Sequence, residues 1–184
     1  MRPSNIDWAL GVAILTSQRS TCYRRNVGAV LLNARGHIIS TGVNGVAAGL
    51  LHCNEPVVSP PEDGRINSYA NRCSGFCSKC VTNLDACQAI HAEQNALLQC
   101  RNVYEIHSCV VTTAPCVTCT KLLLNTTCQQ IIFVDSYPQA VASKSLWESA
   151  KRQWNHVKAP ISVLATGYNA CATNDERLIN IDTL

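Results

Sequence analysis

The chain contains 184 residues, of which 47% are hydrophobic and 15% are charged. A chain of this size and composition forms one domain with a substantial core, and the class of disordered proteins is excluded. The formal net charge of +3 is too small to indicate a nucleic-acid polymer as partner, since such a partner requires a clustered basic face. The same charge is compatible with small anionic ligands.

The amino-terminal segment and the cysteine content bear on location. Residues 1–7 contain no apolar stretch of the signal-peptide type, and no run reaches the roughly 18 apolar residues that a membrane span needs. We therefore expect a cytoplasmic protein without a membrane partner. In the reducing cytosol, clustered cysteines more often bind metal than form a disulfide scaffold, so metal binding best explains the 12 cysteines. Four of them are expected to be plain residues of the core or near the surface: Cys100, Cys109, Cys128 and Cys171.

The first elements predicted along the chain are a helix and a hairpin. Ser4 begins a pattern that resembles a capping box, and apolar residues at helical spacing follow it, so a helix is expected over residues 5–18. Two apolar segments, 27–32 and 37–43, are typical of strands. Residues 33–36 include an asparagine and a glycine, which favour a tight turn between these strands.

A long polar stretch without periodicity follows the hairpin, from residue 44 to about residue 85, and it contains several prolines, glycines and cysteines. A structureless loop of this length would be unusual in a compact domain. Cross-linking by a metal ion is one physical way to order it. We therefore expect a single domain over residues 1–184, with a zinc-stabilised, cysteine-rich insertion at about 46–86.

Helices and strands alternate in the second half of the chain, which predicts a sheet with helices on its faces. The expected elements are, in chain order, a helix over 87–100, a strand over 108–112, a helix from 115 or 116 to 125, a strand over 130–134, a helix over 138–154 and a strand over 161–166.

Two short segments of this second half carry the side chains that point to chemistry. One is the sequence His-Ala-Glu at residues 91–93, and the other is Pro-Cys-Val-Thr-Cys at residues 115–119. Cys116 and Cys119 are three residues apart at a predicted helix start, so both thiols lie on one face of the first turn. The helix dipole and the unpaired amide groups there favour thiolate, which is the form that binds metal.

His91, Cys116 and Cys119 provide one imidazole and two thiolates. Zinc prefers four ligands, so three protein ligands leave one position for water, as in catalytic sites. Zinc lowers the pKa of bound water toward about 7, and a nearby carboxylate must then carry protons to the leaving group. Glu93 is placed for that role. The competing interpretation is a closed structural zinc site with a fourth protein ligand, but such a site has no use for an acid–base carboxylate.

A His-x-Glu sequence followed by Pro-Cys-x-x-Cys is the signature of zinc nucleobase deaminases. Over about residues 5–166 the chain resembles the deoxycytidylate deaminase family, within the cytidine deaminase superfamily. Residues 91–96 are close to its His-Ala-Glu-x-Asn-Ala sequence, and residues 41–45 resemble its Gly-Tyr-Asn-Gly loop. Residues 27–30 match its first strand, and Tyr137 falls where the family has a tyrosine. The resemblance implies a three-layer α/β/α fold with a central mixed sheet of five strands.

The resemblance also implies roles for residues around the zinc. Asn44 would hydrogen-bond the deoxyribose, and Ala92 and Tyr137 would line the nucleotide site. Arg24 and Arg25 are candidates for the phosphate on charge alone. Other interpretations stay open, because an asparagine before a glycine is also turn chemistry and either arginine would be ordinary as a solvated surface charge.

Regulation and assembly are further implications of the resemblance. Members of the family are commonly homohexamers that dCTP activates and dTTP inhibits, and the Gly-Tyr-Asn-Gly loop takes part in that regulation. Gly42, Asn44 and Gly45 would have the allosteric role in this chain. Val43 replaces the tyrosine of the loop, so the departure from the family pattern concerns the regulation more than the catalysis.

A second, structural zinc often occurs in phage and bacterial members, and Cys22 and Cys53 lie where two of its ligands are expected. The position of a usual later ligand, residue 89, is alanine here. One metal could use Cys22, Cys53 and two later cysteines such as Cys80 and Cys87, or four later cysteines could form a separate zinc knuckle. The further candidate ligands are His52, Cys73, Cys77, Cys80 and Cys87.

Together these features predict the zinc-dependent hydrolysis of dCMP to dUMP and ammonia, a step in the pyrimidine deoxynucleotide metabolism that leads to dTMP. Glu93 would protonate N3 of the cytosine and later the amino group. The alternatives are a deaminase of dCTP, deoxycytidine or a riboflavin precursor, a tRNA- or DNA-editing deaminase, and a non-catalytic zinc-binding module. An editing enzyme would need a basic groove with aromatic platforms, whereas this chain is 5% aromatic. A binding module would have no need of Glu93.

Overall fold

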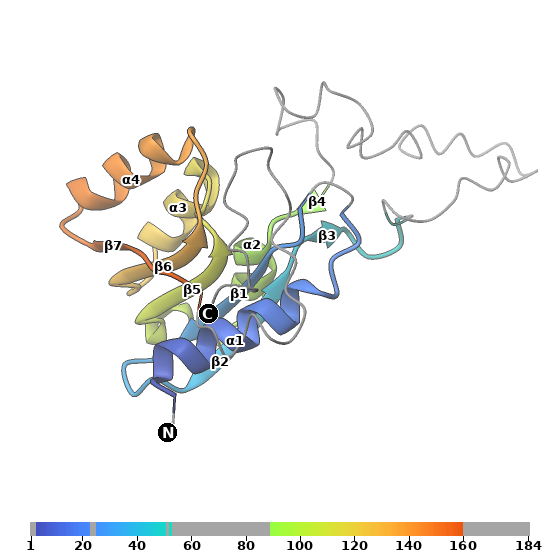
Figure 1. Ribbon diagram of the computed structural model, residues 1–184, viewed down its shortest axis with the longest axis horizontal. Coiled ribbons are helices and arrows are strands. Elements are labelled where there is room, and N and C mark those ends of the chain that lie inside the picture. Colours follow the sequence, from blue (N-terminus) through green and yellow to red (C-terminus); the bar gives the residue numbers. More distant parts are fainter. Residues whose placement is uncertain (1–2, 23–24, 51, 53–88, 160–184) are drawn as a thin grey trace, which may run out of the picture.

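The protein is represented by a computed structural model, which describes residues 3–22, 25–50, 52 and 89–159. Its central sheet consists of β1 (Gly28–Leu32), β2 (Ile38–Val43), β5 (Ser108–Thr113), β6 (Gln130–Asp135) and β7 (Gln153–His156). The order across the sheet is β2-β1-β5-β6-β7 (Figure 1). β1 is antiparallel to β2 and to β5, whereas β5, β6 and β7 are parallel. The expected mixed five-stranded sheet is therefore confirmed.

Helices cover both faces of the sheet and produce the expected three layers (Figure 1). Because side chains alternate along a strand, Val30 of β1 packs on the α1 side, whereas Ala29 and Leu31 pack on the opposite side. The described part of the chain contains no helix with the length and apolar character of a membrane span. The helices are α1 (Asn5–Ser17) on one face, and α2 (Ala92–Gln99), α3 (Val117–Leu124) and α4 (Ala140–Ser149) on the other.

The predicted first helix and hairpin are confirmed. The Ser4 hydroxyl accepts a hydrogen bond from the Asp7 amide at 3.0 Å and donates one to the Asp7 carboxylate at 2.7 Å, which caps the start of α1. β1 and β2 are joined by a turn in which Gly36 has a φ of 77°. This left-handed conformation favours glycine because it has no Cβ.

Gly28 lets α1 lie directly on β1. A Cβ atom at this position would lie 2.0 Å from the carbonyl oxygen of Ala13 and 2.7 Å from the amide nitrogen of Ser17. Both atoms belong to the backbone of α1, so no side-chain movement could relieve the clash. The short distance between α1 and β1 therefore requires a residue without a Cβ atom at position 28.

Gly42 has the same function on the opposite face, where α2 lies on β2. A Cβ atom at Gly42 would lie 2.1 Å from the carbonyl oxygen of Ala92. Two side chains add hydrogen bonds between these elements, since the Ser40 hydroxyl donates to the Ala96 carbonyl and the Asn95 amide donates to the Val43 carbonyl at 2.7 Å. The start of α2 is thus fixed on the end of β2.

Two predicted helix boundaries were wrong. The helix expected over 87–100 begins at Ala92, because Ala89–Ile90 form the short strand β4, which pairs with β3 (Gly45–Val46). The helix expected over 138–154 ends at Ser149. Lys151 then has a φ of 58°, which no α-helix accommodates, and the chain turns into β7.

The fifth strand of the sheet is β7, which the sequence pattern did not predict. Its residue Trp154 packs against Phe133 of β6 with ring centroids 5.1 Å apart. Packing against the neighbouring strand therefore outweighs the helical pattern that these residues continue. The strand predicted over 161–166 and most of the cysteine-rich insertion lie outside the described residues.

We predict that Gly28→Ala lowers the free energy of unfolding by roughly 1–3 kcal/mol or more, because the backbone of α1 must move to admit the methyl group. Urea unfolding of the two proteins measures this difference. Gly45→Ala is the matched control, because a Cβ there meets only the Thr21 hydroxyl, at an ordinary 3.7 Å. Equal stability of the two variants would contradict the prediction.

Candidate metal centre

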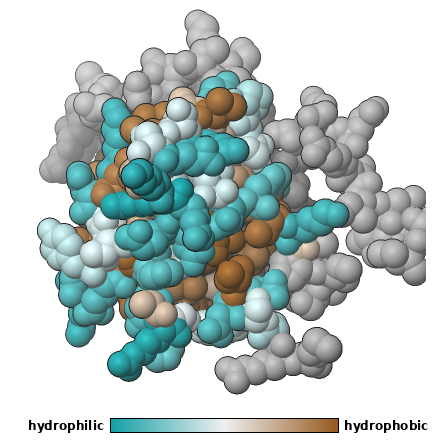
Figure 2. Space-filling model, turned by 90° about the vertical axis from the view of Figure 1, so that its left-hand side faces the viewer, coloured by the Kyte–Doolittle hydropathy of each residue, from teal (hydrophilic) through white to brown (hydrophobic). Residues whose placement is uncertain are grey.

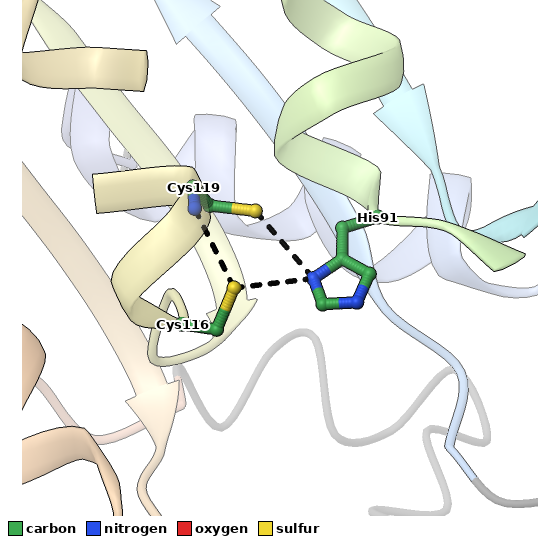
Figure 3. Close-up of side chains that lie close together, drawn as sticks. All are labelled: His91, Cys116 and Cys119. Carbon is green, nitrogen blue, oxygen red and sulfur yellow. Dashed lines mark hydrogen bonds between the residues drawn. The ribbon is translucent and has the colours of Figure 1, made fainter. Parts of the chain in front are cut away.

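His91, Cys116 and Cys119 come together above the sheet, although 25 residues separate the histidine from the first cysteine (Figure 3). His91 is the residue before α2, Cys116 is the residue before α3, and Cys119 lies in the first turn of α3. Nδ1 of His91 is 3.4 Å from Sγ of Cys116 and 3.5 Å from Sγ of Cys119. The three predicted ligands therefore face one point.

The backbone around the ligands explains this convergence. The His91 amide donates a hydrogen bond to the Gln94 side chain at 2.8 Å, which fixes the turn from β4 into α2. The Cys119 amide donates to Sγ of Cys116 at 3.4 Å, as an amide does at a helix start. Gln94 was not among the predicted site residues, although a glutamine three residues after a helix-capping position is a recognisable sequence pattern.

The donor set fits zinc. One imidazole nitrogen and two sulfur atoms, all within 4.8 Å of one another, can occupy three corners of a tetrahedron. Hydrogen bonding from the Cys119 thiol, followed by that from His91, lowers the pKa of Cys116. The pKa of Cys119 is raised by its hydrogen bond to Cys116 and by burial. The two thiols thus share a proton that a doubly charged metal ion would displace.

Glu93 lies in the first turn of α2 and is only 3% exposed. Burial is the main cause that raises the pKa of this carboxyl group to about 7. A backbone hydrogen bond, the positive charge of His91 and a hydrogen bond with Cys119 partly oppose the shift. A carboxyl group in this range can both accept and release a proton near neutral pH. Glu93 thus lies beside the three potential metal ligands, and its acid–base role stays a prediction.

Asn44, Arg25 and Tyr137 are also near the centre. The buried Asn44 side chain accepts a hydrogen bond from the Val27 amide and donates one to the Arg25 carbonyl, both at 2.8 Å. These bonds use one of its two amide hydrogens and one acceptor position, so capacity for a ligand remains. The Arg25 guanidinium carbon lies 5.6 Å from the centre of the Tyr137 ring.

Tyr137 lies close enough to the potential metal ligands to interact with them electrostatically. Burial is the first cause that raises the pKa of its hydroxyl, and the negative charges of Cys116 and Glu93 add to the shift. Ala92 is buried between His91 and Glu93, with its carbonyl against Gly42. Arg24 lies outside the described residues.

The predicted second zinc site is only partly described. Cys22 is half-buried, and the adjacent Thr21 hydroxyl lies 3.3 Å from Nδ1 of His52, which brings this candidate ligand near Cys22. Within the described ranges, the group His91, Cys116 and Cys119 is the one cluster of three potential ligands. The other candidates lie outside the described residues: Cys53, Cys73, Cys77, Cys80 and Cys87.

Cys109 and Cys128 are fully buried in the core, as the sequence predicts, and Cys100 is half-buried. None of the three belongs to the cluster around His91. Cys171 lies outside the described residues.

Comparison with known proteins identifies the family to which this chain is similar. Residues 3–135 match the family model described as the cytidine and deoxycytidylate deaminase zinc-binding region, and this range includes His91, Glu93, Cys116 and Cys119.

Among curated proteins, the deoxycytidylate deaminase of Schizosaccharomyces pombe is 30% identical over 81% of this chain and 42% of its own length. That of Saccharomyces cerevisiae is 29% identical over 89% of this chain and 49% of its own length. That of Mycobacterium phage D29 is 33% identical over 72% of this chain and 95% of its own length. The chain thus spans less than half the length of the two yeast relatives and nearly all of the phage relative.

The fold has solved counterparts. The dCMP deaminase of cyanophage S-TIM5, solved in complex with dCMP and dUMP, aligns with a TM-score of 0.60 at 23% identity, over 85% of this chain and 99% of the other. RibD from Acinetobacter baumannii aligns with a TM-score of 0.52 at 17% identity, over 90% of this chain and 38% of the other. These similarities concern the fold. With the family model matching 133 consecutive residues and its zinc-binding motifs converging in space, the chain belongs to the cytidine and deoxycytidylate deaminase family.

Proposed function

We propose that this chain hydrolyses dCMP to dUMP and ammonia with the help of zinc. The observation that carries the proposal is the buried carboxyl group of Glu93 beside a three-ligand metal centre, which leaves a fourth position for water. The curated relatives named deoxycytidylate deaminase support dCMP as the substrate.

Zinc bound by His91, Cys116 and Cys119 supplies the Lewis acidity that lowers the pKa of water to near neutrality. Glu93 then accepts a proton from the attacking water and delivers it to N3 of the cytosine. The new bond joins the water oxygen to C4. Glu93 next takes the second proton of that oxygen and delivers it to the amino nitrogen, so that the C4–N bond breaks and ammonia leaves. Water and dCMP thus balance dUMP and ammonia, and Glu93 ends as it began.

Recognition of the nucleotide is assigned to residues at the rim of the centre. Asn44 has a remaining donor for a deoxyribose hydroxyl, and Ala92 and Tyr137 line the nucleotide site. Arg25, whose guanidinium carbon lies 5.6 Å from the centre of the Tyr137 ring, is the first phosphate candidate, and Arg24 is the second. These roles are supported by the family resemblance and by the proximity of Asn44, Arg25 and Tyr137 to the centre.

Regulation and assembly follow the same resemblance. We assign dCTP and dTTP, as effectors, to the loop that contains Gly42, Asn44 and Gly45, in a homohexamer. The close packing of Gly42 on Ala92 supports this assignment, because a shift of that loop would move the start of α2 and hence Glu93.

A second zinc ion is assigned to Cys22 together with Cys53, Cys80 and Cys87, with Cys73 and Cys77 as alternatives. The hydrogen bond between Thr21 and His52 supports it, because it brings the chain next to Cys53 close to Cys22. Cysteines stay reduced and available as metal ligands in a reducing compartment, which favours the cytoplasm.

Replacing Cys116 by serine is expected to remove one zinc ion per chain, because a hydroxyl group is a far poorer ligand than a thiolate. Elemental analysis of the purified proteins measures the zinc content. Cys100→Ser is the control, since Cys100 is outside the cluster. Zinc that remains in Cys116→Ser reports the structural site, and a wild-type protein with only one zinc ion would rule that site out.

Replacing Glu93 by glutamine is expected to leave zinc bound while kcat for dCMP falls about 10²-fold to 10⁴-fold, since the amide cannot carry protons. Ammonia release and zinc content are measured on the same preparation. Loss of zinc in this variant would show that Glu93 serves the metal rather than the proton transfer.

The wild-type enzyme is expected to have a higher kcat/KM for dCMP than for deoxycytidine, and Arg25→Met is expected to reduce this ratio, because a charge-assisted contact to phosphate is lost. Ammonia release with dCMP, dCTP, deoxycytidine and cytosine provides the comparison. Equal turnover of deoxycytidine and dCMP by the wild-type enzyme would reject the phosphate recognition.

A further inference from the structure

The Arg152 side chain bonds the carboxyl end of α3. Its Nη1 donates a hydrogen bond to the Leu123 carbonyl at 3.2 Å, and its Nη2 donates to the carbonyls of Leu124 and Thr126 at 3.0 and 3.2 Å. The last carbonyls of a helix have no partner within the helix, and a positive charge there is favourable to the helix dipole. The Leu123 carbonyl also accepts hydrogen bonds from the Thr126 amide at 3.1 Å and the Thr126 hydroxyl at 2.7 Å. Arg152 adds its positive charge and joins this carbonyl to those of Leu124 and Thr126 with one planar group.

Arg152 is itself fixed. Its guanidinium carbon lies 5.1 Å from the centre of the Trp147 ring, and Trp147 is completely buried. Nε1 of Trp147 donates to the carbonyl of Gln153 at 2.9 Å. The backbone of Lys151, with its φ of 58°, places Arg152 immediately before β7. The guanidinium group therefore connects α3 to α4 and to the edge of the sheet.

The other end of α3 carries two of the three metal ligands. Cys116 precedes the helix and Cys119 lies in its first turn, so the positions of both sulfur atoms follow the direction of the helix axis. The helix has only eight residues, which is about 12 Å at 1.5 Å per residue. Because the helix is short and stiff, a displacement of its carboxyl end tilts the whole helix and moves the sulfur atoms at its amino end. A metal site requires its ligand atoms to lie within about 0.5 Å of their positions.

We propose that Arg152 is a positioning residue of the metal centre, which aligns α3 so that Cys116 and Cys119 face His91 at the separation that one metal ion needs. The inference rests on the metal binding in the proposed function, but it does not depend on the identity of the substrate. It differs from a simple contribution to stability, because a stabilising residue would leave the coordination of the folded protein unchanged.

The test uses the full chain, stripped of metal and titrated with Co²⁺ alone, whose bonds to thiolates give a charge-transfer absorption. The absorption that remains in Cys116→Ser belongs to the proposed second site and is subtracted. Competition of Zn²⁺ with a chromophoric chelator measures the affinity of the same preparations. Arg152→Met is expected to weaken the metal affinity about tenfold or more, as the loss of a supporting group around a metal does, and to reduce the thiolate–cobalt absorption. Arg152→Lys keeps the charge and is expected to recover part of both.

Arg35→Met is the matched control, because Arg35 is an exposed arginine in the β1–β2 turn. If Arg152→Met and Arg152→Lys unfold more easily but bind Co²⁺ and Zn²⁺ as the wild type does, Arg152 is only structural and the inference is wrong. If Arg152→Met does not fold, the affinity and the absorption of Arg152→Lys decide by the same criteria.

The outcomes for the wild type separate this inference from the proposed function. A wild-type protein with no thiolate–cobalt absorption would overturn both. A wild-type protein that shows the absorption but does not release ammonia from dCMP would overturn the proposed function alone, and the affinities of the Arg152 variants would still decide the role of Arg152.

Discussion

The candidate metal centre of this protein depends on two helices that begin at one point above the sheet. The start of α2 supplies His91 and Glu93, the start of α3 supplies Cys116 and Cys119, and the histidine nitrogen faces both sulfur atoms at 3.4–3.5 Å. Helix starts have unpaired amide groups and partial positive charge, which favour thiolate ligands. Glu93 is buried at the same point, and this burial raises the pKa of its carboxyl group, so that the two helix starts place a candidate metal site beside a carboxyl group that titrates near neutral pH.

Both helices are held to this point by contacts far from it in sequence. Gly42 and Asn95 fix α2 on the end of β2, and Arg152 fixes the far end of α3. The mixed sheet makes these contacts possible, because its antiparallel part brings the end of β2 beside the start of β1, while its parallel part directs β5 and β6 toward the same edge. The potential metal ligands lie on short segments, and their positions are fixed by the packing of α2 and α3 on the sheet.

The ligand cluster and Glu93 could be predicted from the sequence because their information is local: two sulfur atoms three residues apart at a helix start, and a carboxylate two residues from an imidazole. The start of α1 and the first hairpin were predictable for the same reason, since Ser4 and Gly36 act on their immediate neighbours. The end of α4 and the strand β7 were not. Trp154 continues a helical pattern, and it is the left-handed Lys151, the parallel pairing with β6 and the contact with Phe133 that make this segment a strand. Arg152 has no sequence signature, because its three partners lie at least 26 residues away.

The turn between β1 and β2 has a practical consequence. Gly28 and Val43 pair at the open end of the hairpin, where Gly28 contacts α1 and Val43 contacts α2. The turn closes at the opposite end of the strands, roughly 16 Å away at 3.3 Å per residue. Ala34 and Arg35 project from that turn into solvent, and the Asn33 side chain holds its backbone through the amides of Arg35 and His37. A fluorophore or a surface linker attached at residue 34 would therefore lie on a rigid support at the end of the hairpin opposite to the candidate metal centre, which makes this turn a suitable attachment point for immobilising the protein.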